Sequence, residues 1–209
     1  MKKQNDQIIN RFIVGPLGVN CYCLADELSK DACLIDPGAD PEKIERYIEK
    51  NGFNLKFIIN THGHGDHIAA NGWFKVPIYI HKLDGPLLTD PEKNLSAAML
   101  FPVVSPPASR FLQDNDKIQL GNLTLEVIHT PGHTEGSISI KVDGMIFTGD
   151  TLFNESIGRT DMYGGSEDAI LRSINEKLLL FGDDTVIYPG HGEPSTIGRE
   201  RKSNPFLVD

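Results

Sequence analysis

Three of the seven histidines in this 209-residue chain fall within the single segment HGHGDH at 62–67. A His-x-His-x-Asp-His string is expected by chance in roughly 6 of 10,000 chains of this composition. Imidazole and carboxylate groups are ligands for zinc, iron or manganese. The segment therefore predicts a metal site rather than a solvated polar loop.

The spacing within this segment favours two metal positions. His62 and His64 are two residues apart after an apolar run, so in extended chain their side chains point the same way and suit one ion. Asp66 and His67 follow where the chain turns into a helix, so they can reach a second position. We expect the two interleaved glycines to let the backbone bend tightly.

Three further candidate ligands, His133, Asp150 and His191, each follow an apolar run and a Gly or Pro-Gly turn. Residues just past strand ends gather at one edge of a sheet, where α/β folds place their sites. Five imidazoles and two carboxylates exceed the ligand number of one tetrahedral ion, but they suit two ions that share a bridging carboxylate and a bridging hydroxide. We therefore predict a binuclear hydrolytic centre with two divalent metal ions, zinc first, with iron or manganese as alternatives.

The remaining histidines and the cysteines are interpreted as structural. His129 lies at a strand end, and His81 is expected to begin an acidic, exposed helix. Cys21, Cys23 and Cys33 are odd in number and lie in apolar runs, which is typical of reduced core thiols. We therefore expect a cytoplasmic protein.

Short strands bounded by turn residues must position the candidate ligands. Strands are predicted at 7–14, 19–25, 31–36, 56–60, 76–80, 118–120, 123–129, 137–142, 145–149 and 185–188. Helices are predicted at 41–51 and 166–180, with shorter ones at 67–74, 82–88 and 92–100 and a surface loop at 101–115. Asp40 is expected to cap the first helix, Gly52 to end it, and Ser166 to begin the second. The class is mixed α/β.

The net charge argues against two classes of binding partner. The 29 acidic and 20 basic residues give a net charge of −9, which would repel nucleic acid and an anionic membrane surface. No apolar run approaches the length that a bilayer requires, so neither a signal peptide nor a membrane anchor is expected.

Several motifs together resemble the metallo-β-lactamase superfamily. They are THGHGDH at 61–67, HTPGHTEGS at 129–137, GDTLF at 149–153 and PGHG at 189–192, with NCY at 20–22, IDPGAD at 35–40, GRTD at 158–161 and TIGRERKSNPF at 196–206. The resemblance implies one domain over 1–209, a four-layer αββα sandwich with the metals at one edge. It places His62, His64 and His133 on one ion, Asp66, His67 and His191 on the other, and Asp150 between them.

Within this superfamily the chain is similar to short glyoxalase-II-like proteins. Asp150 resembles the bridging Asp of the hydroxyacylglutathione hydrolase branch, whereas secreted β-lactamases characteristically carry Cys there. Only 18 residues follow His191, so we expect no separate C-terminal helical domain for glutathione. Arg159 occupies a place where related enzymes have a basic residue near the thiol-bearing part of the substrate, so it is a candidate anion anchor.

The resemblance leads to a hypothesis of thioester hydrolysis on a small-molecule substrate, with S-acylglutathione as the model. Asp66 would bind metal and orient the attacking hydroxide. The departing thiolate, of pKa about 8.5, leaves without a strong general acid. The sequence does not predict the oligomeric state or the natural acyl group.

Three alternatives stay open. Persulfide dioxygenases of the same branch carry a comparable GRTD segment and use one iron held at positions that match His62, His133 and Asp150. A lactonase is disfavoured because Phe153 stands where such enzymes typically have Tyr. A non-enzymatic metal-binding protein is disfavoured because a binuclear site with an open bridging position is costly to assemble.

Overall fold

The second strand of the chain, β2 (Val19–Asp26), is buried at all eight positions, so it must be covered on both faces. Tyr22 and Leu24 point into one apolar cluster, and Cys21 and Cys23 point into another, as the two-residue period of a strand requires. The strand therefore lies inside a sheet with one layer on each side.

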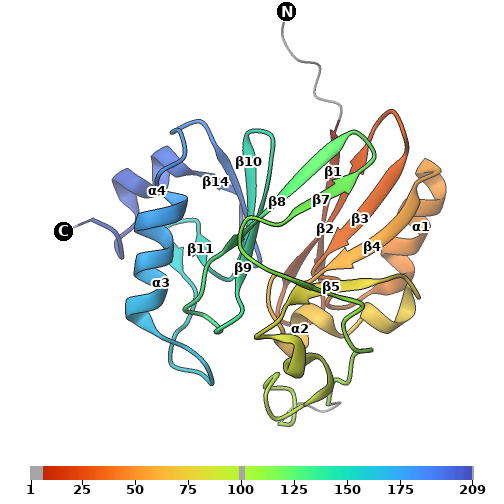
Figure 1. Cartoon of the computed structure of the whole chain (residues 1–209), viewed down its shortest axis with the longest axis horizontal. Coiled ribbons are helices and arrows are strands. Elements are labelled where there is room, and N and C mark those ends of the chain that lie inside the picture. The colour runs from red at the N-terminus through yellow and green to blue at the C-terminus, as the bar shows by residue number, and fades with distance from the viewer. Residues whose placement is uncertain (1–6, 99–101, 209) are drawn as a thin grey trace, which may run out of the picture.

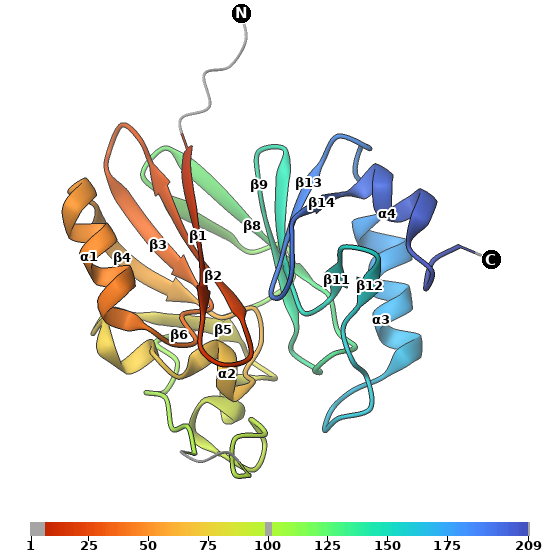
Figure 2. The same ribbon diagram turned by 180° about the vertical axis from the view of Figure 1, so that it is seen from behind.

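The computed structural model describes residues 7–98 and 102–208. Two six-stranded sheets pack face to face, and helices cover both outer faces (Figure 1). This is the four-layer αββα sandwich that the motifs predicted. The turned view in Figure 2 shows that the N-terminal half of the chain builds one sheet with its helices and the C-terminal half builds the other.

The first sheet has its strands in chain order: β1 (Gln7–Val14), β2, β3 (Asp31–Ile35), β4 (Asn54–Ile59), β5 (Ile78–His81) and β6 (Arg110–Leu112). The second runs β14 (Ser195–Thr196), β13 (Val186–Pro189), β10 (Met145–Gly149), β9 (Ile138–Val142), β8 (Leu123–His129) and β7 (Lys117–Leu120). A small hairpin joins β11 (Leu152–Phe153) to β12 (Ser156–Ile157). Parallel pairs β3–β4 and β10–β13 need crossovers, and α1 (Pro41–Asn51) and α3 (Glu167–Ser173) supply them.

Helix α1 has the predicted bounds but a different start. Asp40 has φ 53°, and its carboxylate accepts a hydrogen bond from the Gly15 N–H at 3.1 Å instead of capping the helix. Gly52, at φ 64°, ends the helix as expected. Ile44 and Ile48 are buried against the first sheet.

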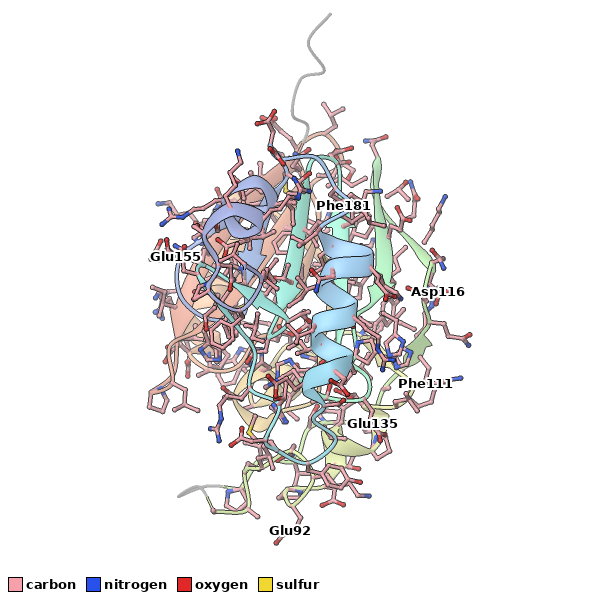
Figure 3. All side chains as sticks on the ribbon, turned by 90° about the vertical axis from the view of Figure 1, so that its left-hand side faces the viewer. Glu92, Phe111, Asp116, Glu135, Glu155 and Phe181 are labelled. Atoms are coloured by element: carbon pink, nitrogen blue, oxygen red, sulfur yellow. The ribbon has the colours of Figure 1, made fainter. Side chains whose placement is uncertain are left out.

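Helix α3 covers the second sheet, and Figure 3 looks onto it with Glu135 near its beginning and Phe181 near its end. The Ser166 hydroxyl accepts a hydrogen bond from the Ala169 N–H, so the predicted cap is confirmed. The helix continues as a π-turn at Ile174–Leu178, closed by a Leu179 N–H to Ile174 carbonyl bond of 2.8 Å. One apolar face over 166–180 is therefore confirmed, with a wider last turn.

The shorter predicted helices are weaker than expected. The region 67–74 overlaps the end of α2 (Gly65–Ile68) and contains a 3-10 turn at Asn71–Trp73, and 82–88 overlaps a 3-10 turn at Gly85–Thr89. The part of 92–100 within the described residues forms turns, and 99–101 lie outside them. The expected loop at 101–115 is wrong at Arg110–Leu112, where β6 pairs with β5. The C-terminal α4 (Ile197–Ser203), begun by Thr196, was not predicted.

Two other expectations concern the core. Cys21, Cys23 and Cys33 are described, buried and without a disulfide, and burial raises the pKa of all three thiols, that of Cys23 to about 12. His81 does not begin an exposed helix: it ends β5, is 4% exposed and stacks on His129 with ring centroids 4.2 Å apart. In the described residues, no helix has the length and apolarity needed to span a membrane.

Candidate metal centre

The predicted ligands lie together at one edge of the sandwich, where strand ends from both sheets meet. His62 and His64 follow β4 in extended chain, and α2 then carries Asp66 and His67. Three segments of the second sheet bring the rest: His133 follows β8, Asp150 follows β10 and His191 follows β13. The structure therefore gathers all seven residues from four separate segments.

Glycines permit this close approach. A Cβ on Gly190 would lie 2.1 Å from an Asp150 carboxylate oxygen and 2.8 Å from the His67 ring. Within the HGHGDH segment, a Cβ on Gly63 would lie 2.5 Å from Leu87 and one on Gly65 would lie 2.8 Å from Ser96. Neither of these two glycines has a positive φ. They are required for space and not, as expected, for a tight bend.

The first group of donor atoms comes from His62, His64 and His133, which lie within 4.8 Å of one another. The His133 Nδ1 lies 2.7 Å from the Arg159 carbonyl oxygen, so it carries the proton and leaves Nε2 free to face His64 Nδ1 at 2.9 Å. Burial, followed by the neighbouring imidazoles, lowers the pKa of His62 and lowers that of His64 to about 3. This group therefore consists of neutral imidazoles.

Threonine 61 fixes the tautomer of His62. The Thr61 hydroxyl donates its one proton to Asp36 at 2.6 Å, so it can only accept from His62 Nδ1, 3.1 Å away. The other ring nitrogen, Nε2, then carries a lone pair, is buried and has no hydrogen-bond partner in the described part of the chain. A buried lone pair without a partner is costly, and a bound metal ion would satisfy it.

The second group comes from Asp66, His67 and His191. The His67 Nδ1 lies 3.1 Å from Asp36, and its Nε2 lies 3.3 Å from His191 Nε2. Burial alone would lower the pKa of His67, but the carboxylates of Asp150, Asp66 and Asp36 outweigh it and raise the pKa to about 10. This position therefore attracts positive charge, unlike the three-histidine group.

Asp150 lies between the two groups. One carboxylate oxygen is 3.5 Å from His67 Nε2, and the other is 3.6 Å from both His133 Nε2 and His191 Nε2. The first of these oxygens is buried and has no hydrogen-bond partner among the residues described. The Asp150 carboxylate is thus placed to contact both groups.

A buried carboxylate whose role was not predicted from the sequence connects two of the ligand-bearing loops. Asp84, after β5, accepts hydrogen bonds from the Gly63 N–H at 2.9 Å, the Thr134 hydroxyl at 2.8 Å and the Gly136 N–H at 2.8 Å. Gly63 separates His62 from His64, and Thr134 follows His133. Asp84 therefore holds the loops of the three-histidine group in place.

Asp36 supports both groups and was detectable in the sequence. It directly follows the apolar strand β3 and precedes a Pro-Gly turn, so it stands at a strand end as the other candidates do, although they come after their turns. Besides contacting Thr61 and His67, it accepts a 2.7 Å hydrogen bond from the Thr61 N–H. Asp84 had no such signal, because its role depends on loops that are distant in sequence.

The cluster opens into a cavity of about 350 Å³, within the range typical of small-molecule pockets. Asp150, His191 and Phe153 line it together with Arg159. The Arg159 side chain is 70% exposed and forms two hydrogen bonds, of 3.0 and 2.9 Å, with Asp161. The candidate anion anchor is therefore at the cavity, and its present partner is an exposed carboxylate.

Comparison with known proteins identifies the family. The model of the metallo-beta-lactamase superfamily matches residues 14–191, which include all seven clustered residues. The chain belongs to this superfamily. Its layers are those that the resemblance implied.

Some of the relatives carry functional names. The chain is 37% identical to the probable metallo-hydrolase YqgX of Bacillus subtilis, over 94% of this chain and 96% of that protein. It is 36% identical to the hydroxyacylglutathione hydrolase GloC of Haemophilus influenzae, over 90% and 92%. Together with the fold and its His and Asp groups, these names support a metal-dependent hydrolase.

Solved structures show the same fold. The BLEG-1 B3 metallo-beta-lactamase superposes with a TM-score of 0.92 at 35% identity, over 97% of this chain and all of that one. TTHA1623 in a di-iron-bound form gives a TM-score of 0.83 at 33% identity, over 95% and 100%. ETHE1 from Myxococcus xanthus gives 0.77 at 27% identity, over 95% and 83%.

Proposed function

We propose that this protein is a binuclear metal-dependent hydrolase that cleaves a thioester of the S-acylglutathione type. The observation that carries the proposal is the placement of Asp150 between two groups of donor atoms at the wall of an open cavity. His62, His64 and His133 would hold one ion, and Asp66, His67 and His191 the other. The buried, unpartnered Nε2 of His62 supports this assignment.

The chemistry follows from the positions of these side chains. When bound, the two ions would lower the pKa of water from 15.7 towards about 7 and so supply hydroxide at neutral pH. Asp66 would accept a hydrogen bond from that hydroxide and direct it at the substrate carbonyl. Attack on the carbonyl carbon forms the new carbon–oxygen bond, and collapse of the tetrahedral adduct then breaks the carbon–sulfur bond and releases the thiolate. The carboxylic acid that remains loses its proton to solvent and leaves as a carboxylate.

A thioester suits this site better than an amide. The thiolate, of pKa about 8.5, leaves without protonation, whereas an amine must be protonated as it departs. The similarity to GloC, a hydroxyacylglutathione hydrolase, supports the same substrate class. The similarity to BLEG-1 makes a β-lactam the necessary comparison substrate in any assay.

A mononuclear iron persulfide dioxygenase is the second candidate. It is favoured by the GRTD segment at 158–161 and by the similarity to ETHE1. His62, His133 and Asp150 would then hold one iron, since imidazole and carboxylate ligands also suit iron(II).

Metal content and oxygen uptake distinguish the two candidates. We expect two ions per chain, by elemental analysis of protein purified without added metal, and anaerobic release of free thiol from S-lactoylglutathione. Zinc is the expected metal, and iron or manganese would also be consistent with these ligands. One iron per chain with oxygen uptake on glutathione persulfide would overturn the hydrolase proposal. Turnover of nitrocefin in place of the thioester would reassign the substrate.

A further inference from the structure

A second cavity, of about 520 Å³, adjoins the cavity at the seven clustered candidate ligands, which we call the metal cluster. Leu17 and Asp66 line both cavities, so the second one opens beside the second group of ligands. A third cavity shares Ala39 and Ala69 with the second and extends it to Trp73. We call the second and third cavities together the apolar groove.

The lining of the groove is apolar except at its mouth. Small residues contribute one side, including Gly38, Ala39 and Ala69, and the turn between β1 and β2 contributes another, including Leu17. Figure 2 shows this turn beside α2. Asp66, at the end nearest the metal cluster, is the one charged residue that lines the groove in the described part of the chain.

Arg159 and the groove adjoin different groups of the clustered residues. The Arg159 carbonyl accepts the hydrogen bond from His133, so Arg159 adjoins the three-histidine group. Val19, just after the turn that carries Leu17, pairs with His191 through a β-bridge, so the groove adjoins the second group. A carbonyl held between the groups therefore has a cation on one side and apolar surface on the other.

We propose that the groove binds the acyl chain of a straight-chain fatty acyl thioester while the thiol carrier lies on the Arg159 side. The inference rests on the proposed thioester hydrolysis and specifies its substrate class. Thiol carriers such as glutathione and coenzyme A bear carboxylates or phosphates, which match Arg159. A saturated acyl chain has no polar group beyond its carbonyl, which matches a groove where the described lining has no charged residue past Asp66.

The rate should rise with the length of the acyl chain. A fully buried methylene favours binding by roughly fourfold, and in a groove open on one side about half of that free energy, or about twofold, is expected. From acetyl to octanoyl glutathione, six added methylenes should raise kcat/KM about 60-fold. The metal-loaded full-length protein should be used.

Variants test whether the groove causes this rise. Ala69→Phe places a ring in the groove, so it should lower kcat/KM for the octanoyl thioester at least tenfold more than for the acetyl thioester. Leu17→Ser should reduce the chain-length dependence by removing apolar lining. Its matched control is Leu28→Ser, because Leu28 is also an exposed leucine in a turn flanking β2, but at the opposite end.

A binding measurement separates this inference from the proposed reaction. S-octylglutathione and S-methylglutathione are thioethers that cannot be hydrolysed, and calorimetry should show tighter binding of the octyl compound with a negative heat-capacity change. Ala69→Phe should remove that difference. If no thioester is turned over, the proposed reaction fails and this titration alone decides on the groove.

Two outcomes would overturn the groove assignment even in an active thioesterase. One is a kcat/KM that is flat or falls from acetyl to octanoyl. The other is a rise that Ala69→Phe leaves unchanged. Equal affinities for the octyl and methyl thioethers would overturn it in either case.

Discussion

The two edges of the sandwich both use buried carboxylates to join distant segments, but they differ in how completely the protein satisfies its own polar groups. At the edge opposite the metal cluster, Asp26 is 0% exposed and accepts hydrogen bonds from the N–H groups of Leu28, Ser29 and Asn122 and from the Asn122 side chain. Asn122 lies between β7 and β8, so this carboxylate joins the two sheets (Figure 1). At the cluster edge, buried atoms of His62, His64 and Asp150 lack partners among the described residues.

This difference shows which edge satisfies its buried polar groups with the protein's own hydrogen bonds. Buried polar atoms without partners are costly, so the cluster edge is less stable by itself than the Asp26 edge. We therefore expect substitutions at the cluster edge to change metal content and turnover, and substitutions at the Asp26 edge to change stability.

The largest expected effect is that of Asp66→Asn. The amide keeps the shape of the side chain but loses the charge that would bind metal and orient the nucleophile, so kcat for the best thioester should fall about 100- to 1,000-fold. The midpoint of urea unfolding should stay within the error of the wild type. Asp168→Asn, on the exposed surface of α3, is the control. An unchanged kcat in Asp66→Asn would contradict the role assigned to it.

Asp84→Ala should lower both the stability of the fold and the affinity for metal. Three donors that now bind Asp84 would lose their partner, which should cost about 2–3 kcal/mol in the free energy of unfolding. The loops of the three-histidine group would also loosen, so metal affinity should fall about 10- to 100-fold. Elemental analysis after dialysis against a graded chelator measures the second effect. Full metal retention in a destabilised variant would restrict Asp84 to a structural role.

Asp26→Ala should affect stability alone. The N–H groups of Leu28, Ser29 and Asn122 would lose their acceptor, and we expect a loss of about 2 kcal/mol from urea unfolding curves. Metal content and kcat at 25 °C should match the wild type. Loss of metal in the folded variant would show that the two edges are coupled.

The smallest expected effect is a pH dependence at the Asp26 edge. Burial opposes ionisation, but hydrogen bonds from Ser29, Asn122 and Leu28 outweigh it and lower the pKa of Asp26 from 3.8 to about 2. Because the folded-state pKa lies below the unfolded one, this stabilisation is present above pH 4 and is lost as pH falls to about 2. It should amount to about 1–2 kcal/mol. In Asp26→Asn, the decrease in the free energy of unfolding between pH 4 and 2 should be smaller by this amount. An unchanged pH dependence would contradict the prediction.

The sequence predicted the parts of the fold that carry local signals. Apolar runs ended by turn residues located most strands, and the helix at 41–51 had Pro41 at its start and Gly52 at its end. The strand Arg110–Leu112 was missed because it lies in a proline-rich stretch and depends on pairing with β5. The 3-10 turn at Gly85–Thr89 replaced a predicted helix because packing of one short turn does not follow from periodicity.

The candidate site also divides into residues with a local sequence signal and residues whose role depends on long-range packing. The seven clustered residues could be proposed from spacing and strand-end context, since each stands next to its own local signal. Asp84 could not, because Gly63 and Thr134 meet it only after the two sheets pack. Asp36 lay in between: its Pro-Gly context was visible, but its contacts with Thr61 and His67 follow from the folded geometry.

The burial of the three cysteines has a consequence for a reaction that releases a thiol. Cys21, Cys23 and Cys33 are at most 1% exposed, and burial raises the pKa of each. Thiol–disulfide exchange requires an accessible thiolate. The folded protein should therefore form no mixed disulfide with oxidised forms of the thiol that the proposed reaction would release, and its activity should persist as the surrounding thiol pool becomes more oxidising.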